Sequence, residues 1–218
     1  MPPLAKLYLL SYNSLQFFGW SLALSKVLSS LLATKSFHGS YSSAGDLISL
    51  LQTLSFLEVI HAAVGLVPSG VMLALMQWGG RTHFLLAIVR QIAEIQVLPS
   101  IFITFTAWSV AEVIRYSHYA MTSLGLCPSW LTYLRYTAFI ILYPIGVAAG
   151  EMWLMYQALP FINERELFSN CFDKLTFNYY SFVVAVLVCY PVLWLKLYLH
   201  LFKQRRSKLG KAERKKQL

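Results

Sequence analysis

Long apolar segments recur along nearly the whole chain, and they constrain its fold more than any other feature. Hydrophobic residues make up 57% of the 218 residues, whereas charged residues make up only 12%. A run of about 20 apolar residues can cross a bilayer, and within lipid a helix satisfies its own backbone hydrogen bonds. Six segments qualify as membrane spans: about 11–33, 46–68, 82–98, 100–120, 131–159 and 178–202. The sequence therefore predicts an all-α, polytopic membrane protein, a bundle of six transmembrane helices.

The charge distribution divides the chain into a transmembrane domain, 1–202, and a basic tail, 203–218. The tail has eight basic residues and one acid, so it carries +7 of the net charge of +9. A basic tail directly after a span indicates a cytosolic C-terminus rather than nucleic-acid binding, and an even number of spans places the N-terminus on the same side. The last four residues, KKQL, match the dilysine retrieval pattern, so we expect a multi-pass protein of the endoplasmic reticulum membrane.

The cysteines indicate neither a disulfide framework nor a metal site. Cys127, Cys171 and Cys189 are odd in number and form no CxxC pair. Structural zinc sites and small disulfide scaffolds both need paired cysteines or a cysteine–histidine set. We therefore expect no metal and no redox cofactor.

The fifth predicted span contains the residues of greatest chemical interest. Tyr143 stands directly before Pro144, and Gly146 and Gly150 lie between this tyrosine and Glu151. A proline frees a backbone carbonyl one turn earlier, and glycines at this spacing allow close packing of helices. A weak acid and a carboxylate beside a broken turn, inside a membrane, are typical of a reactive site. The alternative is a kinked packing helix whose glutamate pairs with an arginine, and residue types alone do not separate the two.

Further polar residues lie within the other spans, most of them between mid-membrane and its cytosolic half. They are Glu58 and His61 in the second span, Arg90 and Glu94 in the third, and Trp108, Glu112, Arg115, Tyr116 and Tyr119 in the fourth. Residues three or four apart share a helix face. Because each charge in a membrane costs roughly 2.5–3.5 kcal/mol, we expect these side chains to face one another around a cavity entered from the cytosol. Arg90 and Glu94, four apart, could instead pair only with each other.

One segment superficially resembles the active-site loop of tyrosine phosphatases, H-C-x-x-G-x-x-R-S/T. Between His61 and Ser69, Ala62 replaces the nucleophilic cysteine and Pro68 replaces the phosphate-binding arginine. Without a thiolate or a guanidinium group, neither step of that chemistry has an agent. The sequence therefore excludes phosphatase activity.

Four segments together resemble the 3-hydroxyacyl-CoA dehydratase family, formerly described as protein-tyrosine-phosphatase-like, and within it most of all the plant PASTICCINO-type branch. They are YNSLQFFGW (12–20), LEVIHAAVGLVPS (57–69), WSVAEVIRYSHY (108–119) and PSWLTYLRYTAFIILYPIGVAAGEMWLMYQALP (128–160). The resemblance covers nearly the whole chain, and the patterns W-S-x-x-E-x-I-R-Y and L-Y-P-x-G are specific in combination.

The resemblance implies an enzyme of very-long-chain fatty-acid elongation that converts 3-hydroxyacyl-CoA to trans-2-enoyl-CoA, the third step of the cycle. Its partners would be the acyl-CoA substrate, membrane lipid, a condensing enzyme, a ketoacyl-CoA reductase and an enoyl-CoA reductase. The family's catalytic tyrosine and glutamate carry over to Tyr143 and Glu151, with the roles of acid and base unassigned. Supporting or substrate-binding roles are expected for Glu58, His61, Arg90, Glu112, Arg115 and Tyr116. The CoA phosphates would lie near Arg81 or Arg135, and the alternatives are a non-catalytic scaffold of the elongase complex or a small-molecule transporter.

The spacing of the two catalytic candidates departs from the family pattern. Most members place the pair seven residues apart, whereas Tyr143 and Glu151 are eight apart. In an ideal α-helix a spacing of seven brings two side chains within roughly 20° of each other, but a spacing of eight separates them by roughly 80°. We therefore predict a local irregularity, either a break at Pro144 or a π-bulge near 148–150. A regular helix with Glu151 directed at lipid would remove it from the site.

Overall fold

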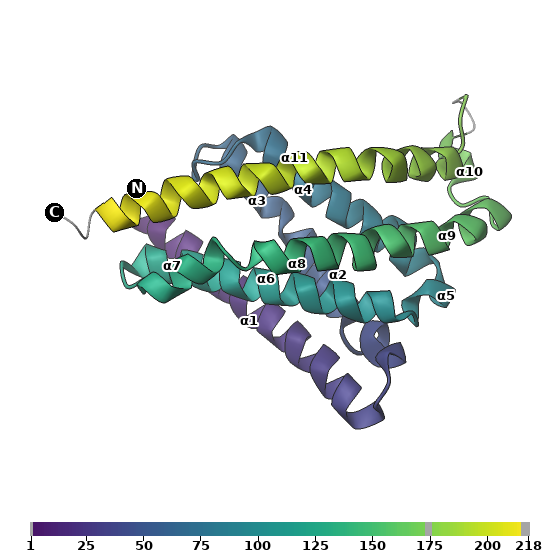
Figure 1. Ribbon diagram of the computed structural model, residues 1–218, viewed down its shortest axis with the longest axis horizontal. Coiled ribbons are helices and arrows are strands. Elements are labelled where there is room, and N and C mark those ends of the chain that lie inside the picture. Colours follow the sequence, from purple (N-terminus) through teal and green to yellow (C-terminus); the bar gives the residue numbers. More distant parts are fainter. Residues whose placement is uncertain (1, 173–175, 215–218) are drawn as a thin grey trace.

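The computed structural model describes residues 2–172 and 176–214, and every regular element within these ranges is helical (Figure 1). The α-helices are α1 (Pro3–Thr34), α2 (Ser40–Leu54), α3 (Phe56–Ala63), α4 (Val71–Thr82), α5 (Ala93–Gln96), α6 (Pro99–Leu124), α7 (Ser129–Arg135), α8 (Phe139–Pro144), α9 (Trp153–Glu164), α10 (Ser169–Phe172) and α11 (Tyr179–Arg214). The 3₁₀-helices η1 (Phe37–Gly39) and η3 (Val89–Gln91) and the π-helices η2 (His83–Ile88) and η4 (Ile145–Met152) connect or interrupt them. The predicted all-α class is confirmed.

Four helical stretches are long and apolar enough to cross a membrane, and they indicate a multi-pass membrane protein. They are Pro3–Thr34, Phe37–Ala63, Ser129–Glu164 and Tyr179–Gly210. They coincide with the first, second, fifth and sixth predicted spans. The helical stretch 71–91 and α6 occupy the places of the third and fourth, but neither meets the same combination of length and hydropathy.

The third predicted span, 82–98, is misplaced along the chain. Its helix begins at Val71, and Gly79 and Gly80 lie inside α4 without ending it. It ends after η3, where Ile92 adopts an extended conformation with φ −125° and ψ 98°. Glycine inside a helix costs only about 1 kcal/mol relative to alanine, and tertiary packing readily offsets this cost, so these glycines do not mark a helix end.

The packing of α1 against α6 forms the centre of the bundle. On α1, Gln16, Trp20, Ala23 and Val27 recur every three or four residues, and all are buried. This spacing presents one continuous face of the helix to its neighbours. The buried apolar cluster extends from this face to Phe105 of α6 and through the other central helices. α6 thus lies where its polar face can meet several helices at once.

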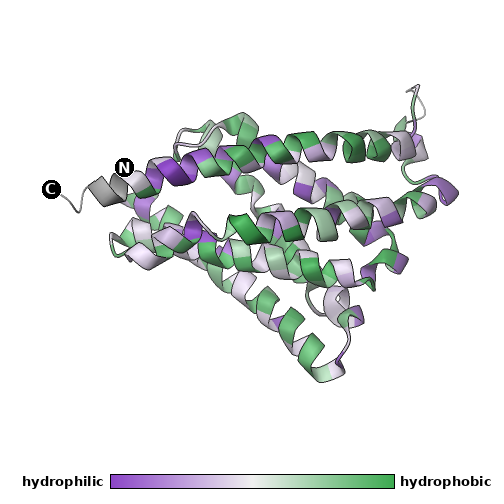
Figure 2. Ribbon diagram, in the orientation of Figure 1, coloured by the Kyte–Doolittle hydropathy of each residue, from purple (hydrophilic) through white to green (hydrophobic). Residues whose placement is uncertain are grey.

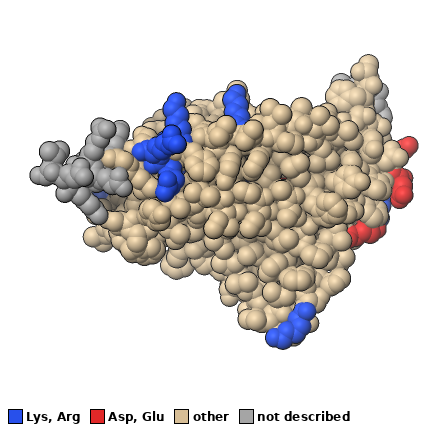
Figure 3. Space-filling model, viewed as in Figure 1, with Lys and Arg blue, Asp and Glu red and all other residues tan. Residues whose placement is uncertain are grey.

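The two ends of the molecule differ in charge. α1 begins and α11 ends at the same end of the molecule (Figure 1). Hydrophobic residues dominate the middle of the helices, whereas hydrophilic residues concentrate towards their ends (Figure 2). On the face shown in Figure 3, Lys and Arg gather mainly towards the end where α11 finishes, and Asp and Glu gather at the opposite end. The last part of the tail, Lys215–Leu218 with the predicted KKxx signal, lies outside the described residues, while α11 continues the last span through 203–214.

Candidate active site

The chain is not a regular helix between Tyr143 and Glu151. α8 ends at Pro144, and the π-helix η4 follows from Ile145 to Met152 before α9 resumes α-helical geometry. A π-turn holds one residue more than an α-turn, so eight residues across it act roughly as seven would in an α-helix. Glu151 consequently points into the protein, with 5% of its surface exposed. The predicted irregularity is confirmed, and Glu151 keeps its place as a candidate.

Two glycines allow η4 to lie directly against α6. A methyl group added to Gly150 would lie 2.4 Å from Oγ1 of Thr104, and one added to Gly146 would lie 3.1 Å from Cβ of Ala107. Both distances are shorter than a carbon contact of about 3.5 Å. The G-x-x-x-G spacing therefore serves close helix packing here. It also brings Glu151 alongside Trp108, which lies one turn beyond Thr104 on α6.

Both carboxylate oxygens of Glu151 accept hydrogen bonds from neutral donors. Oε1 accepts from Nε1 of Trp108 at 2.7 Å, and Oε2 accepts from the hydroxyl of Tyr190 on α11. An indole N–H can only donate, so Oε1 is held in the role of an acceptor. The alternative prediction, a structural glutamate paired with an arginine, differs from these contacts, because Trp108 and Tyr190 donate to the two carboxylate oxygens.

Tyr143 is held by its ring and keeps its hydroxyl free. The ring stacks on Tyr198, with centroids 6.2 Å apart and planes 8° apart, and on Trp194 at 6.4 Å and 18°. Within the described residues its hydroxyl forms no hydrogen bond. Trp194 lies one turn after Tyr190 on α11, so these two side chains share a helix face. Because Tyr190 contacts Glu151 and Trp194 contacts Tyr143, the two predicted catalytic residues face the same part of α11.

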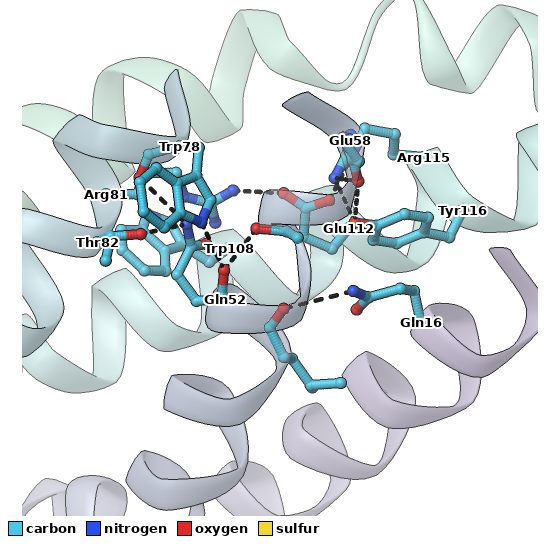
Figure 4. A network of polar contacts seen from close by, with 12 residues as sticks. Gln16, Gln52, Glu58, Trp78, Arg81, Thr82, Trp108, Glu112, Arg115 and Tyr116 are labelled. Carbon is cyan, nitrogen blue, oxygen red and sulfur yellow. Dashed lines mark hydrogen bonds and ion pairs between the residues drawn. The ribbon is translucent and has the colours of Figure 1, made fainter. Parts of the chain in front are cut away.

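Arg81 of α4 connects Trp108 to a larger polar network (Figure 4). Its guanidinium lies over the indole of Trp108, 3.9 Å from the ring centroid, and its Nη1 donates to Oε1 of Glu112 at 2.5 Å. A cation over an indole face is stabilising, and more so when it is shielded from water. Arg81 therefore has two partners within the protein, and the predicted contact with CoA phosphates stays a prediction. Arg135, the other predicted phosphate ligand, hydrogen-bonds the hydroxyl of Tyr119 at 3.2 Å.

Arg115 joins the two glutamates of the network. Its Nη1 and Nη2 lie 2.6 and 3.0 Å from the two carboxylate oxygens of Glu58, and its Nε lies 2.5 Å from Oε2 of Glu112. The hydroxyl of Tyr116 also donates to Glu58. With Arg81, the network has two positive and two negative charges, and such pairing offsets part of the cost of removing each charge from water. The side chains of the second and fourth predicted spans thus converge as expected, while their roles towards a substrate stay predictions.

His61 extends the network towards α1. Its Nε2 lies 2.8 Å from the hydroxyl of Tyr8, and the ring of Tyr12 meets it edge-on with centroids 5.1 Å apart. Tyr12 in turn donates to Oε1 of Glu58 at 3.2 Å. His61 and Glu58 therefore share a face of α3, as their spacing predicted.

Arg90 and Glu94 lie outside this network, and the predicted pairing between them is wrong. The extended backbone at Ile92 places them on separate short helices, so they are not four apart on one helix. Arg90 lies 3.8 Å from Asp46 with 52% of its side chain exposed, and Glu94 pairs with Arg165. Arg90 thus lies beside Asp46 and apart from the Glu58–Glu112–Arg115 network, and its predicted supporting role stays a prediction.

The sequence-based reasoning missed the contribution of α11. Tyr190, Trp194 and Tyr198 recur every four residues, which places three aromatic side chains on one face of the helix. An aromatic stripe in an otherwise mostly aliphatic span was the available signal. The stripe contains no charged residue, so the pattern of charged residues within the spans did not indicate it.

An apolar groove of about 540 Å³ lies beside Glu151, between α11 and the η4–α9 segment. Its lining residues are Ala148, Met152, Trp153, Tyr156, Leu159, Tyr180, Val184, Leu187 and Val188. Met152 directly follows Glu151, and Val188 lies two residues before Tyr190. The groove is therefore lined by the segments of η4 and α11 whose inward-facing side chains include Glu151 and Tyr190. In contrast, the described parts of the chain contain no group of three or more His, Cys, Asp or Glu side chains that could hold a metal ion.

Comparison with known proteins gives a consistent family. Residues 52–211 match the family described as "Protein tyrosine phosphatase-like protein, PTPLA". The chain is 35% identical over 217 residues to very-long-chain (3R)-3-hydroxyacyl-CoA dehydratase 2 of Homo sapiens, over 98% of this chain and 85% of that protein. It is 35% identical over 211 residues to dehydratase 1 of Ovis aries, over 94% of this chain and 72% of that protein. It is 32% identical over 213 residues to the dehydratase PASTICCINO 2 of Arabidopsis thaliana, over 96% of each.

These identities do not favour the plant branch that the sequence motifs suggested, because the plant protein is no more similar to this chain than the animal proteins are. No solved structure matches the chain.

Proposed function

Because the chain belongs to the protein tyrosine phosphatase-like (PTPLA) family, we propose that it dehydrates very-long-chain 3-hydroxyacyl-CoA to trans-2-enoyl-CoA, as the names of its relatives indicate. The observation that carries this proposal is that a buried carboxylate, Glu151, and a tyrosine, Tyr143, contact the same face of α11. Glu151 accepts hydrogen bonds at both oxygens, and the Tyr143 hydroxyl has no hydrogen-bond partner within the described residues. The chain is thus a carbon–oxygen lyase and not a phosphatase, since Ala62 replaces the phosphatase cysteine.

Loss of water requires a base for the proton on Cα and an acid for the departing 3-hydroxyl group. We assign the base to Glu151, because its contacts hold both oxygens as acceptors. Tyr143 is the acid, because its hydroxyl is not hydrogen-bonded to any group in the part of the chain that the structure describes. Glu151 removes the Cα proton, which the thioester acidifies, the C2–C3 double bond forms as the C3–O bond breaks, and Tyr143 protonates the leaving hydroxyl to give water.

The apolar groove beside Glu151 supports a position for the acyl chain. Its lining is formed by side chains of η4, α9 and α11, and it includes Met152, the residue after Glu151. Binding sites for apolar ligands are concave, are mostly lined by hydrophobic side chains, and carry few polar groups near the reacting atoms. The acyl chain therefore occupies this groove, next to the helical turn that carries Glu151.

The charge distribution supports a topology with six spans and both termini in the cytosol. The four apolar stretches are joined by the helical stretch 71–91 and by α6, and the excess of Lys and Arg lies at the end where α11 finishes (Figure 3). Cytosolic segments carry the excess of basic residues. The endoplasmic reticulum membrane is the proposed location, where the condensing enzyme and the two reductases of elongation would supply the substrate and consume the product.

The proposal is tested with protein purified in detergent and long-chain 3-hydroxyacyl-CoA, by following trans-2-enoyl-CoA with mass spectrometry. Tyr143→Phe and Glu151→Gln should each lower kcat by at least about a hundredfold, because each removes one proton-transfer group. Tyr41→Phe, a partly buried tyrosine of α2 that packs on Phe105, is the matched control and should keep wild-type activity. Full activity of Tyr143→Phe would refute the assignment. A wild-type protein that forms no enoyl-CoA would favour the scaffold or transporter alternatives.

A further inference from the structure

We infer that Tyr190 is a positioning residue for Glu151, which makes α11 part of the active site. Its hydroxyl donates to Oε2 of Glu151, while Nε1 of Trp108 donates to Oε1 at 2.7 Å. The two donors come from different helices, α11 and α6. This inference rests on the proposed dehydratase function and names a residue that the Tyr143–Glu151 mechanism does not include.

A glutamate carboxylate needs two donors if its plane is to be defined. The last torsion of a glutamate side chain is broad and roughly two-fold, so a single hydrogen bond leaves the carboxylate free to swing. Donors at both oxygens fix the direction of the remaining lone pairs. For a base that must meet a Cα–H bond, that direction decides whether the proton can be transferred.

The orientation of Tyr190 is set by the helix that carries it. Val188 and Val192, two residues before and after it, expose 72% and 70% of their surfaces. Residues two apart on a helix point in widely different directions, so Tyr190 faces inward while these valines face outward. Its ring packs against the buried cluster, and its hydroxyl reaches Glu151 of η4.

The same face of α11 also holds the second catalytic candidate. Trp194 and Tyr198 follow Tyr190 at intervals of four residues, and both stack on the ring of Tyr143. The π-helix allows Glu151 and Tyr143 to face one direction, but the side chains of α11 contact both of them. α11 therefore sets the distance between the proton acceptor and the proton donor, with Tyr190 as its contact to the acceptor.

The first test is the kinetics of Tyr190→Phe, which removes the hydroxyl and keeps the ring. We expect kcat to fall about tenfold to a hundredfold, since a small misplacement of a reacting group has an effect of this size, while KM changes by less than about threefold. Gel filtration and circular dichroism should match the wild type. Tyr41→Phe, which also loses one hydroxyl, should leave kcat unchanged.

The second test separates positioning from packing by a double-mutant cycle with Trp108→Phe. Once one donor is missing, the carboxylate is already free to rotate, so Tyr190→Phe should cost less than about threefold in this background. An equal loss of kcat in both backgrounds would show a packing role and overturn the inference. So would a kcat of Tyr190→Phe within twofold of the wild type, provided that the wild type is active. An inactive wild type would instead refute the proposed function, which keeps the two failures distinguishable.

Discussion

Replacement of Gly150 by alanine should destabilise the protein and displace Glu151, because the new methyl group has no room against α6. Its Cβ would lie 2.4 Å from Oγ1 of Thr104 and 3.4 Å from the Cα of the same residue. An ordinary contact needs about 3.5 Å, so η4 or the threonine side chain must move by roughly 1 Å. Overpacking of this kind costs about 1–3 kcal/mol of stability, and a displacement of about 1 Å near reacting groups lowers the rate roughly a hundredfold.

The assay combines thermal unfolding in detergent with the initial rate of enoyl-CoA formation. For a chain of this size, the expected loss of stability lowers Tm by about 2–12 °C. Gly79→Ala in α4 is the matched control, because no atom lies within 4 Å of the added methyl group. Alanine is favoured over glycine inside a helix by about 0.5–1 kcal/mol, so this variant should keep or raise Tm.

A second substitution identifies the contact responsible. Thr104→Ala removes Oγ1, after which the closest approach to the new methyl group is an ordinary 3.4 Å. The combination of Gly150→Ala with Thr104→Ala should therefore regain most of the lost Tm and activity, although Thr104→Ala alone loses the hydrogen bond from Oγ1 to the Ser100 carbonyl. Wild-type Tm and rate in Gly150→Ala, or no rescue by Thr104→Ala, would refute the close approach of η4 to α6.

Two further predictions concern the π-helix and the groove. Deletion of Ala149 removes the extra residue, so the segment can form an α-helical turn with a spacing of seven, and activity should stay within about tenfold of the wild type. Insertion of one alanine after Ala149 should instead turn Glu151 by about 100° and abolish activity. Equal enoyl-CoA formation by both variants would contradict this geometry. Leu187→Trp should narrow the groove, because the larger side chain fills part of its volume. We expect kcat/KM to fall by about tenfold or more for long acyl chains and to change little for short ones, since an overfilled apolar site excludes the longer ligand. Val192→Trp is the control, because Val192 is 70% exposed and does not line the groove. An equal loss of kcat/KM for all chain lengths in Leu187→Trp would place the acyl chain elsewhere.

The helical class and the irregular fifth span were predictable because both depend on local properties of the chain. Apolar runs of membrane length restrict the backbone to helices, whatever their partners. On a straight helix the eight-residue spacing would direct Tyr143 and Glu151 to different sides, so the prediction that they share one substrate required an irregularity between them. The convergence of Glu58, Glu112 and Arg115 was also predictable, because isolated charges in a membrane are costly and must find one another.

The partners of each polar side chain were not predictable, because they depend on contacts between helices. Glu151 binds residues 43 and 39 positions away, Trp108 and Tyr190. Spacing along one helix defines which residues share a face, but not which face of another helix meets it. Arg90 illustrates the error, since an extended residue at Ile92 separated it from Glu94 and left it beside Asp46.

The amino-acid sequence by itself thus determined a helical membrane protein with a tyrosine and a glutamate on an irregular span, since these follow from hydrophobic length, charge cost and residue spacing. The tertiary structure decided how that pair is held. The close approach of η4 to α6, which Gly146 and Gly150 permit, brings Glu151 to Trp108, and the packing of α11 brings Tyr190 and Trp194 to the same place. These contacts depend on the relative position of three helices, a quantity that no periodicity within one helix contains.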